Sequence, residues 1–296
     1  MENVGIITIL GIILTATIRS ATPLIFAALG GNFSEKSGVV NIGLEGIMTV
    51  GAFSAVFFSF KTGSPWAGLL GAIVVGGLFG LLLAFLSINF KANQVVVGVA
   101  INILAASLTT FLLVEIWGRP GQTDNVEYFQ AWGPFSLFTY LAFAMVIVSY
   151  FVMYKTPFGL RIRAVGEHPR AADTLGVNVY LVRYICVIIS GVLAGVGGAS
   201  LSIGSLSLFK EGMIAGKGFI ALAALIFGKW NPIGAALACL FFGFADALQT
   251  VATDLPVPKE FLFALPYLLT MIAVSGFVGR SIAPAADGVP YEKGEK

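Results

Sequence analysis

Long apolar stretches alternate with short polar ones along almost the whole chain. A helix that crosses a bilayer needs about 20 mostly apolar residues. Stretches of this kind cover roughly residues 4–29, 39–60, 65–89, 93–117, 135–154, 181–205, 213–228, 232–251 and 261–279. Several are interrupted, and 213–228 is short enough to be a half-helix. The pattern predicts an all-α, polytopic membrane protein with eight to ten transmembrane helices.

Polar segments bound and divide this membrane domain. We expect residues 1–280 to form a single domain with a cytoplasmic loop at about 155–180. Residues 281–296 are rich in Gly, Pro, Lys and Glu, which predicts a disordered tail. The first three residues lack the positive region of a signal peptide, so we expect the first apolar span to be retained.

Composition agrees with a membrane protein. Hydrophobic residues make up 57% of the chain and charged residues 11%, whereas soluble domains carry about 25% charged residues. The net charge of +2 is spread along the sequence and forms no basic patch for a nucleic acid. We therefore expect a multi-pass protein of the cell membrane, surrounded by lipid, that acts in or across the bilayer.

The distribution of Lys and Arg predicts the orientation, because cytoplasmic loops carry an excess of both. With nine spans and the 155–180 loop inside, the N-terminus lies outside and the C-terminus inside. The inside cations are then Lys36, Lys91, Lys155, Arg161, Arg163, Arg170, Arg183, Lys229, Arg280, Lys293 and Lys296. The outside cations are Lys61, Arg119, Lys210, Lys217 and Lys259. Arg19 remains within a span.

Residues that would support catalysis or metal binding are scarce. Cys186 and Cys239 each stand alone in an apolar span, and His168 is the only histidine. They provide neither a metal-ligand spacing nor a Ser-His-Asp arrangement. Segment 212–218 has three residues between its first two glycines and no Ser or Thr after its lysine, so it does not match a phosphate-binding loop. We expect no catalytic residue, metal site or cofactor in this chain.

Glycine pairs four residues apart occur in two spans. Gly76 and Gly80 share one helix face, and so do Gly191 and Gly195. Such pairs allow helix backbones to approach closely in a membrane, so we expect them to contribute packing rather than function.

The longest polar interval between strongly apolar spans is residues 159–176. Pro169 suits a first helical position, His168 precedes it and Gly176 can end the helix. A helix this short does not hold in water alone, since about 12 residues are needed. We therefore expect it to be ordered by docking on another surface. The alternative is an ordinary basic cytoplasmic loop.

Glu45 is the main ionisable residue inside a predicted span. A charge at the bilayer centre costs at least about 2.5–3.5 kcal/mol on insertion scales. Three glycines and Asn41 surround it in segment 38–46, which favours an irregular helix beside a water-lined cavity. Either Asn41 and Glu45 shape the path of a polar substrate, or Glu45 neutralises a nearby cation and fixes the fold.

Four further polar side chains are candidates for such a path. Asn102 lies within a span, with Gln94 on roughly the same face two turns earlier. Their amides suit a hydroxylated solute, but a buried amide equally often joins two helices. Asp246 and Gln249 lie three residues apart near one end of another span.

The polar loop resembles the coupling loop of ATP-binding-cassette importer permeases, in the branch for simple sugars, nucleosides and branched-chain amino acids. Its candidate coupling residues are Gly159, Arg161, Arg163, Gly166, Glu167, Pro169, Arg170, Ala171, Ala172 and Gly176. Residues 38–53 are similar to permeases of the nucleoside and simple-sugar subgroup. A third match covers residues 242–249 and 265–267.

The resemblance implies a complex of several chains, in which this chain has a type-II-like importer fold. Two permease subunits, this chain with a related chain or with itself, enclose one path. A separate ATPase binds ATP and Mg inside, and an extracellular or periplasmic substrate-binding protein delivers solute outside. The 159–176 loop then passes the motion of the ATPase to the spans. The candidate path residues are Asn41, Glu45, Gln94, Asn102, Asp246 and Gln249.

Other functions remain open at this point. Within the importer class, a permease for a simple sugar or sugar-like molecule is the alternative to one for nucleosides. A stand-alone, ion-coupled secondary transporter is an alternative of another class, for which an inverted repeat or paired buried carboxylates would be expected. An intramembrane enzyme is disfavoured because the sequence offers no nucleophile and base arrangement.

Overall fold

The computed structural model describes residues 6–251 and 281–293. Within these ranges no β-strand forms, and helices account for nearly all regular structure. The α-helices are α1 (Ile6–Lys36), α2 (Leu44–Thr62), α3 (Pro65–Ala84), α4 (Gln94–Trp117), α5 (Leu137–Lys155), α6 (Pro157–Glu167), α7 (Pro169–Thr174), α8 (Val179–Leu201), α9 (Lys217–Phe227) and α10 (Pro232–Val251). Two π-helical turns extend α3 and α8, namely η1 (Phe85–Asn89) and η2 (Ser202–Leu206). The predicted all-α class is confirmed.

Seven of the described helices are long and apolar enough to cross a membrane. They are α1, α2, α3, α4, α5, α8 and α10, each at the position of a predicted apolar span. The predicted span at 213–228 is α9, whose 11 residues are too few to cross a bilayer. It is therefore the half-helix that its length and flanking glycines suggested. The predicted span at 261–279 lies outside the described residues.

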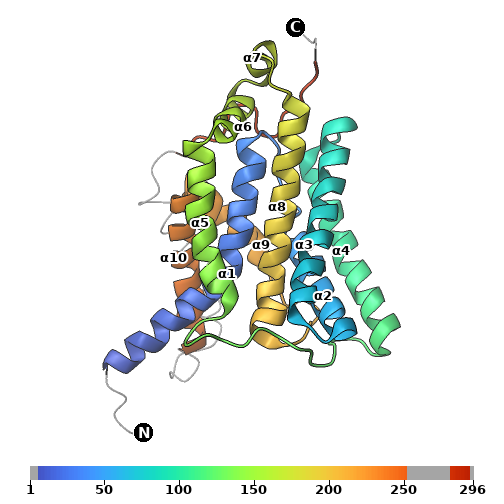
Figure 1. The fold of residues 1–296 in the computed structure, drawn as a ribbon, viewed down its shortest axis with the longest axis vertical. Coiled ribbons are helices and arrows are strands. Elements are labelled where there is room, and N and C mark those ends of the chain that lie inside the picture. Colours follow the sequence, from blue (N-terminus) through green and yellow to red (C-terminus); the bar gives the residue numbers. More distant parts are fainter. Residues whose placement is uncertain (1–5, 252–280, 294–296) are drawn as a thin grey trace.

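The two termini lie at opposite ends of the helix bundle (Figure 1). The C-terminal residues lie at the same end as α6 and α7, hereafter the inner end, and the N-terminus lies at the other, outer end. The names inner and outer are taken from the orientation predicted from Lys and Arg, which stays a prediction. Lys217 differs from that expectation, because it begins α9 and its side chain is only 21% exposed rather than lying in an outer loop.

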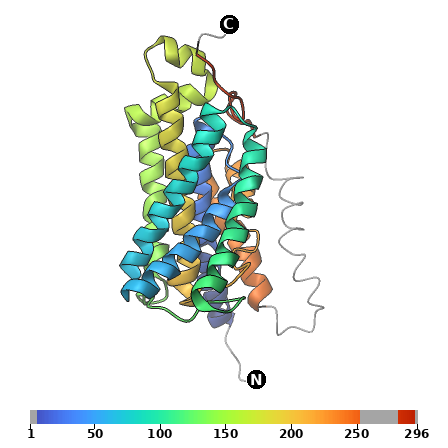
Figure 2. The same cartoon turned by 90° about the vertical axis from the view of Figure 1, so that its right-hand side faces the viewer.

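Close glycine contacts hold the centre of the bundle together. A Cβ atom built on Gly76 would lie 2.5 Å from the Gly191 carbonyl oxygen, and one built on Gly80 would lie 3.0 Å from the Gly191 Cα atom. A Cβ atom on Gly195 would likewise lie 3.1 Å from the Gly76 Cα atom. The two predicted glycine pairs therefore pack directly against each other and join α3 to α8. Figure 2 shows the bundle from the side.

Residues 281–293 cross the inner end in an extended course with defined contacts, which differs from the disordered tail that their composition predicts. The Ala286 N–H donates to the Gly166 carbonyl at 2.8 Å, and Arg183 Nη1 donates to the Val289 carbonyl at 3.0 Å. The Tyr291 ring is buried 5.4 Å from that of Tyr180. Composition misses this order because it comes from docking on polar groups of other helices.

Candidate functional site

The chain leaves helical geometry between α1 and α2. Gly38 has a φ of +89°, a conformation that favours glycine. A Cβ atom there would also lie 2.7 Å from Arg183 Nη2 and 2.9 Å from the Ala286 carbonyl oxygen. The residues from Ser37 to Gly43 form turns and coil before α2 begins at Leu44. We call residues 37–43 the first irregular segment; it matches the broken helix that the sequence predicts there.

Amide side chains from α4 hold this segment in place. Gln94 Oε1 accepts a hydrogen bond from the Val40 N–H at 2.7 Å. Asn102 Oδ1 accepts from the Gly46 N–H at 2.7 Å, and its Nδ2 donates to the Ile42 carbonyl at 3.0 Å. Because Gln94 and Asn102 bond to main-chain groups, this geometry gives them a positioning role.

Asn41 is fully buried between α2 and α8. Its Nδ2 donates to Ser190 Oγ at 2.8 Å. Its Oδ1 has no hydrogen-bond partner among the described residues. A buried acceptor without a partner costs about 1–3 kcal/mol. Asn41 therefore offers an unused acceptor inside the bundle.

Glu45 lies at the first turn of α2 and points to the start of α9. Its Oε1 accepts from the Gly216 N–H at 2.8 Å, and its Oε2 accepts from the Gly218 N–H at 2.7 Å. The first N–H groups of a helix lack intrahelical partners and carry partial positive charge. A Cβ atom on Gly218 would lie 2.9 Å from Oε2, so glycine permits this contact. The carboxylate thus satisfies the N-terminus of α9 within the bundle.

The start of α9 belongs to a second irregular segment, residues 207–216. Gly212 and Gly216 have φ values of +71° and +81°. Sequence reasoning tested only a phosphate-binding role here and missed the contact with Glu45. The available signal was a glycine-rich stretch at the head of a short apolar span, as in residues 38–46.

Asp246 lies near the same helix start. Its Oδ2 atom is 3.7 Å from Lys217 Nζ. Gln249 follows it three residues later on α10. The structure thus brings Glu45 and Asp246 to the first turn of α9, whereas Gln94 and Asn102 support the first irregular segment.

The predicted coupling loop forms two short helices. The Thr156 hydroxyl accepts from the Gly159 N–H at 3.2 Å at the start of α6. Pro169 occupies the first turn of α7 after His168, and Gly176 follows the helix with a φ of +84°. The predicted short helix is confirmed, whereas α6 was not predicted.

The two short helices have a buried and an exposed side. Gly166 is buried against the end of α1, close to the Lys36 carbonyl. Ala172 is buried, whereas Leu175 is 84% exposed. Arg163 is half-buried, with its guanidinium carbon 5.1 Å from the centre of the Tyr154 ring. The other exposed loop residues from the predicted set are Arg161, Glu167, Arg170, Ala171 and Gly176.

A groove of about 410 Å³ lies between α7 and the C-terminal residues. Its walls include Arg170 and Ala171 on one side and Val289 and Tyr291 on the other. Glu167 Oε2 accepts from the Ala285 N–H at 3.4 Å beside it. The inner end therefore presents a surface built from both the loop and the tail.

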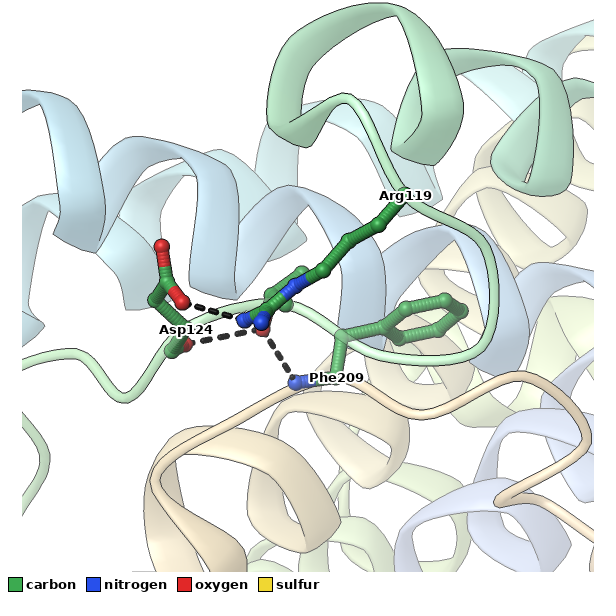
Figure 3. Close-up of polar contacts among 4 residues, drawn as sticks. Arg119, Asp124 and Phe209 are labelled. Atoms are coloured by element: carbon green, nitrogen blue, oxygen red, sulfur yellow. Dashed lines mark hydrogen bonds and ion pairs between the residues drawn. The ribbon is translucent and has the colours of Figure 1, made fainter.

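The outer end is covered by the loop of residues 118–136. Arg119 and Asp124 form an ion pair within this loop (Figure 3). The Thr123 hydroxyl accepts from the Phe209 N–H at 3.0 Å, and the Thr123 N–H donates to the Phe209 carbonyl at 2.9 Å. These bonds attach the outer loop to the second irregular segment.

Comparison with known proteins gives consistent matches over the whole chain. Residues 13–274 match the profile of the family described as the permease component of branched-chain amino acid transport systems. The guanosine ABC transporter permease protein NupQ of Bacillus subtilis is 48% identical over 98% of this chain and 99% of its own length.

Two further relatives extend the comparison. The nucleoside ABC transporter permease protein NupC of Lactococcus lactis is 42% identical over 98% of this chain and 99% of its own length. The putative glucose ABC transporter permease protein TsgC13 of Haloferax volcanii is 39% identical over 84% of this chain and 80% of its own length. With its seven described apolar helices, the chain is a multi-pass cell-membrane protein that belongs to this family of ABC transporter permease components.

Proposed function

We propose that this chain is the permease subunit of an ATP-binding-cassette importer for nucleosides. The observation that carries the proposal is its 48% identity, over 98% of the chain, with a permease named for guanosine. A second relative of similar coverage is named for nucleosides. The relative named for glucose is less similar and less completely covered, so nucleosides are favoured over sugars.

In this proposal, the path runs past the contact between Glu45 and α9. Asn41 and Glu45 present acceptors inside the bundle, and Asp246 and Gln249 lie on the neighbouring α10. Carboxylate and amide groups suit the hydroxyl and ring N–H donors of a nucleoside. Gln94 and Asn102 act indirectly, because they hold the first irregular segment.

In this proposal, the energy for transport is supplied at the inner end. We infer that the exposed side of α7 docks on a separate ATPase, which binds ATP and Mg. Gly166 packs on the end of α1 at Lys36, next to the first irregular segment. A displacement of α6 is therefore transmitted directly to the segment that carries Asn41. Leu175 and Arg170 are the exposed side chains best placed to contact the ATPase.

The remaining partners follow from the same scheme. A second permease subunit, related or identical, completes the path, and a substrate-binding protein delivers the nucleoside at the outer loop. Exposed apolar side chains on α3, α4 and α5, including Leu78, Ile103 and Ile147, are available to lipid or to that second permease.

Uptake of labelled guanosine, uridine and ribose tests the substrate. The assay compares cells that carry or lack this chain, with its partners present. We expect guanosine and uridine uptake to be lost only in the deletion strain and to be competed by unlabelled nucleosides but not by ribose. Loss of ribose uptake alone would move the assignment to sugars. Uptake that survives ATP depletion in the presence of a proton gradient would contradict the importer mechanism.

Coupling is tested by changing the inner surface. Glu167→Ala combined with Arg170→Ala should uncouple transport, but Glu167 also contacts the tail at Ala285. Arg170→Ala combined with Leu175→Ser avoids that contact. We expect this second pair to reduce ATPase binding and nucleoside uptake at least tenfold.

A matched control removes one cation and one equally exposed apolar side chain from the same end. Lys155→Ala combined with Ile282→Ser fits, because Ile282 is 84% exposed, as is Leu175. The control should transport normally. Normal ATPase binding and uptake in the Arg170 and Leu175 variant would refute the proposed docking surface.

A further inference from the structure

A polar cavity lies at the outer end, away from Glu45 and from the groove at the inner end. Its volume is about 220 Å³, and it forms where α1, α5, η2 and the outer loop meet. Six polar or aromatic residues on its wall matter for its chemistry: Arg19, Thr22, Tyr128, Ser136, Thr139 and Ser205. None of the described residues that line it is acidic. The cavity therefore suits a neutral or electron-rich polar ligand rather than a cation.

Arg19 supplies the strongest donors. Its Nε and Nη2 both donate to the Pro134 carbonyl, at 3.1 and 2.7 Å. Within the described residues, no acceptor is bonded to its Nη1 group. A cation on a transmembrane helix is retained only where it meets a partner or a water-filled space. The cavity provides that space, so Arg19 has N–H donors available to a ligand.

Hydroxyl groups line the wall beside Arg19. Thr22 Oγ1 and Thr139 Oγ1 lie 3.0 Å apart and share a hydrogen bond. Ser205 Oγ donates to the Ser200 carbonyl at 3.1 Å. A hydroxyl that donates one hydrogen bond still has lone pairs that accept others. These groups can therefore accept hydrogen bonds from the hydroxyls of a sugar.

An aromatic side chain completes the wall. Tyr128 is 45% exposed and lines the cavity from the outer loop. The neighbouring Phe129 is buried, and its N–H donates to the Ile203 carbonyl in η2 at 2.9 Å. The Ile203 carbonyl of η2 thus holds the outer loop in place beside the cavity. Because Tyr128 is partly exposed at the cavity, its ring is available to stack on a planar base.

Beside the cavity, α1 packs closely on α8 at Pro23, one of the lining residues. A Cβ atom on Gly197 would lie 3.0 Å from the Pro23 carbonyl oxygen and 3.3 Å from Phe26 Cβ, so α1 and α8 touch there. Ser190, the partner of Asn41, lies ten residues before Ser200 on α8. Ten helical residues span about 15 Å. The outer cavity and the site around Asn41 are therefore two separate places in the bundle.

We propose that this cavity is an outer binding site for the nucleoside, occupied before the contact between α1 and α8 opens. Arg19 and the wall hydroxyls bind the ribose hydroxyls, and Tyr128 stacks on the base. This inference rests on the proposed function, since it assumes that nucleosides are the transported class. A pocket with few convergent polar groups and one aromatic face is typical of small-molecule sites.

Protection of an introduced thiol tests occupancy directly. Ala131 lines the cavity and is exposed, while both native cysteines are buried. An Ala131→Cys variant in the assembled importer, reconstituted in vesicles, is treated with a membrane-impermeant thiol reagent from outside. We expect guanosine to slow labelling at least fivefold. A Thr62→Cys variant, exposed at the outer end of α2, should be labelled equally with and without guanosine.

Two results would overturn the proposal. One is unchanged Ala131→Cys labelling at guanosine concentrations above the KM for uptake. The other is equal protection by ribose at the same concentration, which would make the cavity a site for sugars. Arg19→Gln should abolish the protection if the guanidinium binds the ligand.

Transport kinetics provide a second test of the outer site. Arg19→Gln and Tyr128→Leu should each raise the KM for guanosine uptake about tenfold with a smaller change in Vmax. Arg119→Gln is the matched control, because Arg119 is paired with Asp124 outside the cavity. If the unmodified importer takes up no nucleoside, the proposed function itself fails. If it takes up guanosine but Arg19→Gln and Tyr128→Leu leave the KM unchanged, only the outer site fails.

Discussion

Two irregular segments meet at Glu45, but they are held in different ways. The first, residues 37–43, is braced by side chains from α4 and α8: Gln94, Asn102, Ser190 and Arg183. The second, residues 207–216, is tied to the outer loop at Ser207, Phe209 and Glu211. Near α9 it is held by its own turns, such as the bond from the Met213 N–H to the Lys210 carbonyl at 3.1 Å. At the α9 end of this segment, the carboxylate of Glu45 supplies the bonds to the first half of the chain.

This difference indicates which part moves. Breaking the bonds from Gly216 and Gly218 to Glu45 releases the start of α9 without disturbing the amides that brace the first segment. We therefore expect the start of α9, which Glu45 holds through two bonds, to move, and the first segment, with its several cross-braces, to stay fixed. We expect substitutions at Glu45 to affect transport, and substitutions at the braces to affect stability.

Glu45→Gln should have the largest effect on transport. The amide keeps one acceptor and loses the charge, so at least one bond from Gly216 or Gly218 is lost. Hydrogen bonds to charged groups contribute about 1.5–3 kcal/mol each, which corresponds to about tenfold or more. We expect guanosine uptake to fall at least tenfold while the amount of folded protein in the membrane stays within about twofold.

The control for this change is Glu115→Gln, at an exposed position near the outer end of α4. It should leave uptake unchanged. If Glu45→Gln instead removes the folded protein, Glu45 serves the fold. Normal uptake would show that the contact with α9 need not be made by a charged group.

Asn102→Leu should have the largest effect on stability. It leaves the Gly46 N–H and the Ile42 carbonyl without the partners that Asn102 provides. Each unpaired buried group costs about 1–3 kcal/mol. We expect the free energy of unfolding to fall by about 2–4 kcal/mol, measured by thermal or denaturant unfolding of the purified chain in detergent. Ile103→Leu, at an exposed neighbouring position, is the control and should change stability little.

A further outcome would overturn the distinction between the two segments. If Asn102→Leu has the same stability as the unmodified chain but loses uptake, Asn102 lines the translocation path rather than holding the first irregular segment. Stability loss with uptake per folded molecule preserved is the expected pattern.

The sequence predicted the local features of this site better than its contacts. The broken helix at 37–43 follows from glycine and from a carboxylate in an apolar stretch, and α7 follows from Pro169 and Gly176. These are short-range signals. The partner of Glu45 lies 171 residues away at Gly216, and no local pattern encodes that pairing.

Docked segments were the least predictable. Residues 281–293 have a composition typical of disorder, yet Arg183 binds both the Ser37 and the Val289 carbonyls. Their order depends on groups supplied by Gly166 of α6 and Arg183 of α8. The same limit applied to Gln94 and Asn102, for which the sequence could not separate a path from a brace.

The tail also braces the first segment from the inner end, and its contact should depend on pH. Burial raises the pKa of Asp287 to about 7, against smaller lowering effects from the Gly288 N–H and the charge of Arg183. A raised pKa means that the docked tail binds a proton which the released tail gives up near its usual value of about 4. Docking is therefore strongest at low pH and weakens as the pH rises from about 4 through 7.

A fluorophore attached through Val289→Cys should report this release, because that side chain is exposed and the native cysteines are buried. We expect its emission to shift to longer wavelength as the pH rises from about 4 to about 7. Asp287→Asn cannot lose a proton, so it should keep the low-pH emission throughout. An equal shift in both proteins would show that another group controls the tail. A flat response in both would show that the bonds of Arg183 to Ser37 and Val289 hold the tail regardless of Asp287, so that the first segment is braced at every pH in this range.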